Sequence, residues 1–235
     1  MKRLCSVCAR GGSKGVPNKN IRPLLGKPLL IYSLDQARQS DLFDCIVVSS
    51  DSKEILQLAE EWGVDHAIER PEELATDFAA KIPVFQHCFQ TAETLSGMTF
   101  DTAVDLDATS PLRNQDDLKG VVDLLESHDS TTNVITGTTA RRSPYFNLVE
   151  LDEIGRVYLS GKRQNDVKAI VRRQDAPQCY DMNASIYAWW RESLLNTTDH
   201  VIQFGTRLYL MPEERSVDID SELDFRWVEF LMNNE

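Results

Sequence analysis

The sequence has 235 residues, 42% of them hydrophobic, which is enough apolar material for one full hydrophobic core. Its 25 basic and 37 acidic residues give a formal net charge of −12, which argues against nucleic acid as the main partner, since phosphate backbones bind to basic faces. No run approaches the roughly 18 apolar residues of a membrane span, and the N-terminus lacks the apolar stretch of a signal peptide, so we expect a cytoplasmic protein.

Short apolar runs alternate with stretches of helical spacing over the first 127 residues. We expect strands over residues 3–8, 45–49, 64–68 and 102–106, and helices over residues 29–38, 82–95 and 116–127. A further helix is expected between Asp51, as its N-cap, and Gly63. Such alternation predicts an α/β fold with a doubly wound, mostly parallel sheet, in which ligands bind beyond the carboxyl ends of the strands.

The pattern becomes less regular after residue 133. We expect strands over 134–138, 184–190 and 208–211, and a closing helix over 222–232. Residues 141–173 are polar and rich in turns, with short β-like pieces around 145–151 and 156–159. Long insertions of this kind often pack against another chain or form a lid. We therefore expect a single domain over 1–235, with about 139–175 as a dimerisation or lid insertion.

The five cysteines are sparsely placed and odd in number, which predicts reduced thiols. Cys5 and Cys8 have the C-x-x-C spacing of redox and zinc sites, but no second pair follows them. We expect both to be small buried hydrophobic side chains of the first strand.

The loop after the first strand is rich in glycine and positive charge. Seven basic residues and no acidic residue occur in the first 34 positions, and Arg10, Lys14 and Lys19 lie within the segment 9–20. Glycine lets backbone N–H groups approach an anion closely, and the three cations can neutralise several charges at once, as a triphosphate requires. The loop matches neither the Walker A pattern nor G-x-G-x-x-G, and the alternative is an ordinary turn with solvated lysines.

A second candidate site is the segment Val217-Asp218-Ile219-Asp220. Asp-x-Asp in an extended segment places both carboxylates on one face. Mg²⁺ commonly binds one or two carboxylates plus substrate phosphates, so this pair predicts a magnesium site. The alternative is helix capping, with Asp220 or Ser221 capping the closing helix.

Two further loops follow predicted strands. Residues 107–113, Asp-Ala-Thr-Ser-Pro-Leu-Arg, come directly after the fourth strand, which favours ligand contact over a purely capped loop. Arg70, in the segment 69–77, either faces a base or a phosphate or pairs with nearby acids. The sequence does not separate these two interpretations.

Together, the segments 9–20, 70–77, 109–113 and 218–224 resemble, in this order, the CMP-sialic acid synthetase family, the acylneuraminate cytidylyltransferases. The segment 180–187, Tyr-Asp-Met-Asn-Ala-Ser-Ile-Tyr, resembles the family's Asn-Gly-Ala-Ile-Tyr region, so the match covers nearly the whole chain. The resemblance implies a Rossmann-like nucleotidyltransferase that transfers CMP from CTP to the anomeric hydroxyl of a nine-carbon keto acid sugar and releases pyrophosphate. It also implies a homodimer in which residues 141–173 reach the partner.

The resemblance assigns roles residue by residue. The nucleotide would be bound by Arg10, Ser13, Lys14, Lys19, Asn20 and Arg70. The sugar would be contacted by Asp107, Thr109, Ser110 and Arg173. Mg²⁺ would be held by Asp218 and Asp220, and catalysis would depend on Arg10, Lys19 and Asp220.

One departure from the family pattern concerns the sugar. Asp107-Ala108 stands where N-acetylneuraminate enzymes commonly have Gln-Pro, and Asn183-Ala184-Ser185 replaces Asn-Gly-Ala. With the segment 142–147, these changes resemble family members that act on legionaminic acid, a sugar with a deoxygenated C9 and a second acylamino group. The alternatives are N-acetylneuraminate, 3-deoxy-manno-octulosonate, a guanylyl or uridylyl transfer to an aldose phosphate, and a catalytically silent nucleotide-binding subunit.

Overall fold

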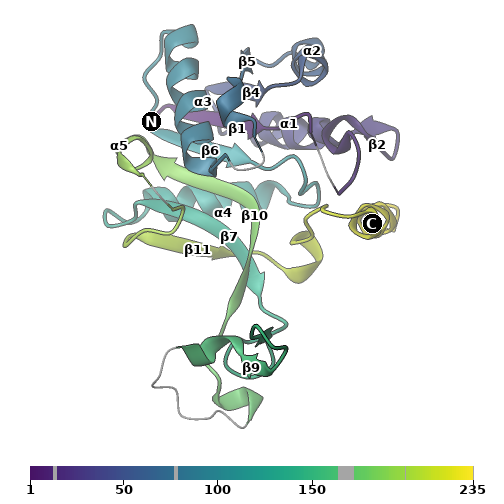
Figure 1. Cartoon of the computed structure of the whole chain (residues 1–235). Coiled ribbons are helices and arrows are strands. Elements are labelled where there is room, and N and C mark those ends of the chain that lie inside the picture. Colours follow the sequence, from purple (N-terminus) through teal and green to yellow (C-terminus); the bar gives the residue numbers. More distant parts are fainter. Residues whose placement is uncertain (13–14, 77–78, 164–171, 199, 235) are drawn as a thin grey trace.

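The structure is a computed structural model that describes all residues except 13–14, 77–78, 164–171, 199 and 235. A seven-stranded sheet forms its centre (Figure 1). The strands of this sheet are β1 (Arg3–Cys8), β4 (Cys45–Ser50), β5 (His66–Glu69), β6 (Thr102–Leu106), β7 (Asn133–Thr139), β10 (Tyr180–Trp190) and β11 (Thr206–Leu210). They lie in the order β11-β7-β10-β6-β1-β4-β5, and all neighbours are parallel except β10, which runs antiparallel to β6 and β7.

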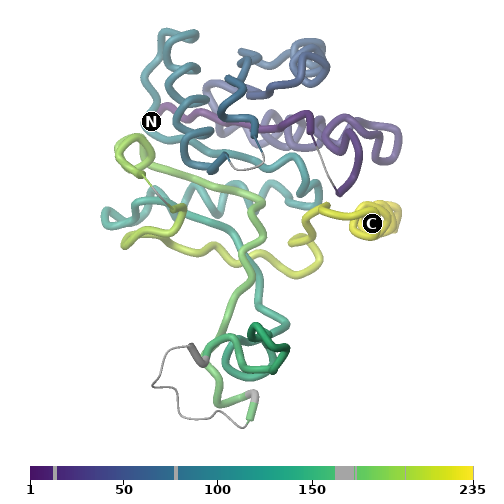
Figure 2. Tube along the Cα trace, in the orientation of Figure 1, coloured from purple at the N-terminus to yellow at the C-terminus, as the bar shows by residue number. Residues whose placement is uncertain are grey.

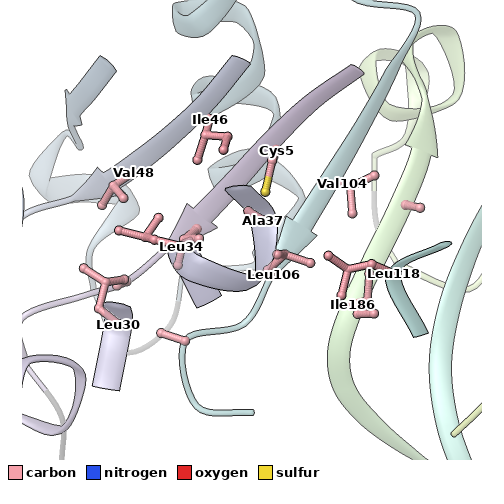
Figure 3. Close-up of a cluster of buried hydrophobic side chains, with 14 of the residues drawn as sticks. Cys5, Leu30, Leu34, Ala37, Ile46, Val48, Val104, Leu106, Leu118 and Ile186 are labelled. Carbon is pink, nitrogen blue, oxygen red and sulfur yellow. The ribbon is translucent and has the colours of Figure 1, made fainter. Parts of the chain in front are cut away.

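Helices cover both faces of this sheet. They are α1 (Leu29–Ser40), α2 (Lys53–Trp62), α3 (Lys81–Ser96), α4 (Gln115–Glu126), α5 (Arg191–Asn196) and α6 (Glu222–Met232). One core cluster joins the sheet to α1, α2 and α4, and Figure 3 shows Leu34, Leu106 and Leu118 within it. A second cluster joins the opposite face to α3 and α5. The predicted α/β fold with a mostly parallel sheet is therefore confirmed, because strands buried on both faces read as continuous apolar runs.

Helix caps correct one detail of the sequence analysis. Asp51 is not the N-cap of α2; Ser52 is, and its side chain accepts a hydrogen bond from the backbone N–H of Ile55. Asp51 instead accepts a hydrogen bond from the N–H of Gly11 at 3.0 Å, which attaches the first loop to the end of β4. The closing helix α6 is capped by Ser221 in a reciprocal capping box with Asp224.

The last helix covers the end of the first loop. A short hairpin, β2 (Pro23–Leu24) with β3 (Lys27–Pro28), precedes α1. A third core cluster joins this hairpin and α1 to α6, and it includes Val16 of the loop and Ile219 between the two aspartates. Burial of Val16 and Ile219 in one cluster therefore brings the basic loop against the Asp-x-Asp segment.

An arm extends from the sheet beyond the ends of β7 and β10 (Figures 1 and 2). It carries the antiparallel pair β8 (Val149–Leu151) and β9 (Val157–Leu159), at the positions where β-like pieces were expected. Strand β10 starts at Tyr180, earlier than the predicted residue 184, because its first residues pair with the end of β7. Within the described part of the chain, no helix combines the length and apolarity that crossing a membrane requires.

Candidate active site

A cavity of about 590 Å³ opens at the carboxyl ends of β1 and β6. The described residues that line it come from six segments of the chain: Cys8, Arg10, Gly15, Lys19, Asn20, Arg70, Lys81, Val84, Phe85, Asp105, Asp107, Thr109, Ala184, Asp218 and Asp220. Four are cations and four are carboxylates. Such a mixture suits a ligand that carries phosphates and, with them, a metal ion.

The first loop supplies one wall. Arg10 and Lys19 line the cavity, and the Asn20 side-chain nitrogen donates to the Arg10 carbonyl oxygen at 2.9 Å, which folds the loop back on itself. The other polar atom of this buried amide, Asn20 Oδ1, has no partner among the described residues. The expected glycine amides are only partly available, because the Gly11 N–H is used by Asp51. Ser13 and Lys14 lie outside the described residues.

Lys19 joins this loop to the Asp-x-Asp segment. Its Nζ lies 3.2 Å from Asp220 Oδ1 and also contacts the Ile219 carbonyl oxygen. Gly15 is packed equally tightly, since a Cβ at this position would overlap the Asp220 carbonyl oxygen. The glycine is therefore needed for close approach of two backbones.

Asp218 lies deeper than Asp220 and belongs to a polar cluster around Thr109. The Thr109 hydroxyl contacts Asp218 Oδ1 and lies 2.7 Å from Asp107 Oδ1. Burial, together with the nearby Asp107 carboxylate, raises the pKa of Asp218 to about 6. A raised pKa marks a carboxylate that lacks a compensating positive charge, which a bound cation would supply.

The two aspartates fit a magnesium ion of the kind that substrate phosphates complete. Asp218 and Asp220 both line the cavity and offer hard oxygen ligands. Among the residues that the structure describes, no group of three or more His, Cys, Asp or Glu side chains is arranged to hold a metal. A metal here would thus need ligands from the substrate, as Mg²⁺ in phosphate sites usually has.

Arg70 follows β5 and is held by the backbone of the neighbouring strand β4. Its side chain is buried, and its Nη2 donates to the carbonyl oxygen of Ser49, near the end of β4, at 2.8 Å. Arg70 also lines the cavity. It therefore contributes a positive charge at a fixed position to the wall of the cavity.

Of the predicted sugar contacts, Asp107 and Thr109 line the cavity, whereas Ser110 does not. The Ser110 side chain is only 1% exposed and faces the interior. Arg173 begins a short 3₁₀ turn in the arm, and its side chain lies outside the described residues. Arg113, at the end of the same motif as Ser110, is buried and donates to the carbonyl oxygens of Asp107 and Ser185 at 2.8 and 3.0 Å. It holds the end of β6 against β10.

The sequence analysis missed several residues of the cavity. Cys5 is buried as expected, but Cys8 is only partly buried and lines the cavity, because residues three apart in a strand face opposite sides. Asp105 was hidden within the apolar strand β6; its alternation with Asp107 was the available signal. Burial raises the pKa of Asp105 to about 6, although the Ser6 hydroxyl donates to it at 2.6 Å. No local pattern in the sequence indicated that Lys81, the first residue of α3, would line the cavity.

A mostly parallel sheet whose strand ends carry a basic loop opposite two carboxylates is the arrangement of a nucleotidyltransferase. The chain belongs to the cytidylyltransferase family, whose model matches residues 4–226, and it is a cytidylyltransferase enzyme. This confirms the resemblance drawn from the motifs.

Known proteins similar to the chain agree with this assignment. The post-translational flagellin modification protein B of Campylobacter coli is 44% identical, over 99% of this chain and 95% of its own. A CMP-N,N'-diacetyllegionaminic acid synthase of Campylobacter jejuni is also 44% identical, over 98% of this chain and 94% of its own. The solved structure of a CMP:2-keto-3-deoxy-manno-octonic acid synthetase with CTP superposes with a TM-score of 0.69 at 16% identity, covering 100% of this chain and 99% of that one, which shows the fold.

Proposed function

We propose that this cytidylyltransferase transfers CMP from CTP to the anomeric hydroxyl of a nonulosonic acid and releases pyrophosphate. The observation that carries the proposal is the contact of the basic loop with the Asp-x-Asp segment, where Lys19 Nζ lies 3.2 Å from Asp220 Oδ1 inside one cavity. This contact unites the groups that a triphosphate requires with those that a metal requires.

The nucleotide occupies the side of the cavity formed by the first loop. Arg10 and Lys19, with Ser13 and Lys14 of the same loop, neutralise the triphosphate. Asn20 Oδ1 is a buried acceptor without a partner among the described residues, so a hydroxyl or amino group of the nucleotide satisfies it in this proposal. Arg70, held by Ser49, faces the base side.

Asp218 and Asp220 hold Mg²⁺ in this proposal. When bound, the ion supplies charge stabilisation to the phosphates and lowers the pKa of a coordinated hydroxyl. The chain's own residues place the reactants: the anomeric oxygen attacks the α-phosphorus, the bond from that phosphorus to the bridging oxygen breaks, and pyrophosphate leaves as the hydroxyl loses its proton. Arg10 and Lys19 stabilise the charge that develops on the phosphoryl oxygens.

The acceptor we propose is a legionaminic acid. Asp107 lines the cavity from the end of β6, at the position where N-acetylneuraminate enzymes commonly have glutamine, and the Campylobacter jejuni relative is named for N,N'-diacetyllegionaminic acid. A carboxylate at this position accepts hydrogen bonds but donates none, so it selects a different set of sugar groups from an amide. Thr109 orients this carboxylate, while the proposed Arg173 contact would come from the arm.

We further propose that the enzyme is a homodimer held by the arm over about 139–175. Leu151, Ile154 and Val157 of the arm are 64%, 75% and 66% exposed. Apolar side chains exposed at this density usually lie at an interface. Sedimentation of the full chain at several concentrations tests this; a monomer at micromolar concentration contradicts it.

Pyrophosphate release tests the proposed reaction. CTP and Mg²⁺ are supplied with N,N'-diacetyllegionaminate, N-acetylneuraminate or 3-deoxy-manno-octulosonate in parallel. Preference for the first acceptor supports both the reaction and the sugar. Preference for either of the other two acceptors supports the proposed reaction but contradicts legionaminic acid as the acceptor. Release with none of them, despite CTP binding, rejects the reaction and favours a nucleotide-binding subunit.

A further inference from the structure

Among the described residues that line the cavity, Lys81 is the one cation that belongs to neither the first loop nor the strand ends. It is the first residue of α3, and its side chain, 47% exposed, reaches the carboxyl end of β6 and the part of β10 that pairs with it. There the Nζ lies 3.5 Å from Asp107 Oδ2 and 3.5 Å from the Tyr187 hydroxyl. An ammonium has three N–H groups. Two of them face these partners, and the third has no acceptor among the residues that the structure describes, so a ligand can accept it.

Asp107 holds this ammonium from a fixed position. Its Oδ1 accepts hydrogen bonds from the Thr109 backbone N–H at 3.1 Å and from the Thr109 hydroxyl at 2.7 Å. The other oxygen therefore faces Lys81. Burial alone would raise the pKa of Asp107, but the Lys81 charge and the Thr109 hydrogen bonds lower it, so the pair is ionised on both sides.

The charge around Lys81 argues against an anionic ligand at this point. Asp107 already neutralises the ammonium, and the buried carboxyl of Asp105 also lines the cavity. A carboxylate or phosphate brought to Lys81 would meet these two acids. An uncharged acceptor, such as an amide carbonyl oxygen, gains the hydrogen bond without this repulsion.

Apolar surface lies on the same face of the helix. Val84 and Phe85 follow Lys81 by three and four positions, which places all three on one side of α3, and both line the cavity. Phe85 is fixed by Tyr187, with ring centroids 5.5 Å apart. A carbonyl acceptor beside a small apolar group is the chemistry of an N-acyl substituent.

We propose that Lys81, Val84 and Phe85 form an acyl-binding site of the acceptor, in which Lys81 donates to the carbonyl oxygen of an acylamino group and the two apolar side chains contact its methyl group. Asp107 and Tyr187 orient Lys81. This inference rests on the proposed function, since it names the part of the nonulosonic acid that the far side of the cavity recognises.

Steady-state kinetics of Lys81→Met test the site. The acceptors are N,N'-diacetyllegionaminate and 2-keto-3-deoxynonulosonate, which carries hydroxyls and no acylamino group. We expect kcat/KM for the diacetylated acceptor to fall about 10- to 100-fold, mainly through KM, because a charge-assisted hydrogen bond is lost. For the acceptor without acyl groups and for CTP, the change is expected to stay within about 3-fold. Lys81→Arg, which keeps the donor, should recover part of the loss.

Two further variants complete the comparison. Val84→Ala removes apolar contact only, and we expect about 3- to 10-fold loss with the acylated acceptor alone. Lys53→Met is the matched control, because Lys53 is the exposed first residue of α2 and lies outside the cavity. Where turnover of the unacylated acceptor is too slow to measure, its inhibition constant against the diacetylated acceptor supplies the same comparison.

The outcomes separate this inference from the proposed function. An equal loss with both acceptors, or a change in the CTP or Mg²⁺ requirement, overturns the acyl site while the reaction stands. Wild-type enzyme that releases no pyrophosphate with any nonulosonic acid overturns the proposed function itself. A loss restricted to acylated acceptors supports both.

Discussion

Lys19 and Asp220 are 201 positions apart in the sequence, yet their side chains form an ion pair with 3.2 Å between Nζ and Oδ1. The two partners differ in environment: the Lys19 side chain is 13% exposed and that of Asp220 is 79% exposed. Lys19 is therefore fixed by the fold, while Asp220 presents its carboxylate to the cavity. Both groups are thus in place before a ligand binds, which is the preorganisation that the proposed reaction requires.

Asp220→Asn is expected to lower kcat by about 100- to 1000-fold, with the KM for CTP changed by less than about 3-fold. The amide keeps the shape of the side chain but loses the charge that a metal and Lys19 both need. Pyrophosphate release at saturating Mg²⁺ measures the effect. Glu222→Gln is the control, since Glu222 pairs with Arg22 on the surface. An unchanged kcat in Asp220→Asn contradicts the metal assignment.

Thr109→Val should lower both the stability of the fold and the apparent affinity for Mg²⁺. Its hydroxyl contacts Asp107 and Asp218, and Val leaves two half-buried carboxylates without this donor. We expect the free energy of unfolding to fall by about 1–2 kcal/mol, and the Mg²⁺ concentration for half-maximal activity to rise. Urea unfolding and a Mg²⁺ titration measure the two effects. Thr109→Ser should restore both, and equal behaviour of Val and Ser would show that the hydroxyl is unimportant.

Gly15→Ala should destabilise the loop contact with the Asp-x-Asp segment. The added methyl group overlaps the Asp220 carbonyl oxygen, which is backbone and moves only with its whole segment. Overpacking of about 2 kcal/mol corresponds to a decrease in Tm of roughly 4–8 °C for a chain of this size. Gly12→Ala is the matched comparison for Tm, because a Cβ there meets nothing within 4 Å. Similar Tm values for the two variants would refute the close approach.

Asp105 should make the stability of the enzyme depend on pH. Its folded-state pKa, about 6, lies above its ordinary value of 3.8, so its contribution is fully present below about 3.8 and is lost as the pH rises through about 6. Asp105→Asn removes this dependence while it keeps an acceptor for Ser6. The stability advantage of the variant should grow by about 1.5 kcal/mol between pH 5 and pH 8. Urea unfolding at both values measures it, and a constant difference contradicts the raised pKa.

Local structure was predicted well where one strong signal decides it. The strands Arg3–Cys8 and Thr102–Leu106 have the predicted limits, because a central strand covered on both faces is mostly apolar and stands out from the polar segments beside it. The start of α2 was predicted one residue early, since Asp51 and Ser52 are both good N-caps. The tertiary structure decides between them, because Asp51 accepts a hydrogen bond from the Gly11 N–H and Ser52 caps the helix.

The sequence by itself determined the chemistry of the two facing segments: a basic glycine-rich loop after an apolar strand, and Asp-x-Asp before the last helix. These are local patterns that need no partner to be recognised. The tertiary structure decided which side chains lie close to one another in the cavity. Lys81 reaches Asp107 and Tyr187 because α3 starts near the carboxyl end of β6, where Tyr187 of the antiparallel strand β10 pairs with Asp105, and this arrangement depends on the order and register of the strands. Strand order is set by packing of the whole core, which no segment of the sequence encodes alone.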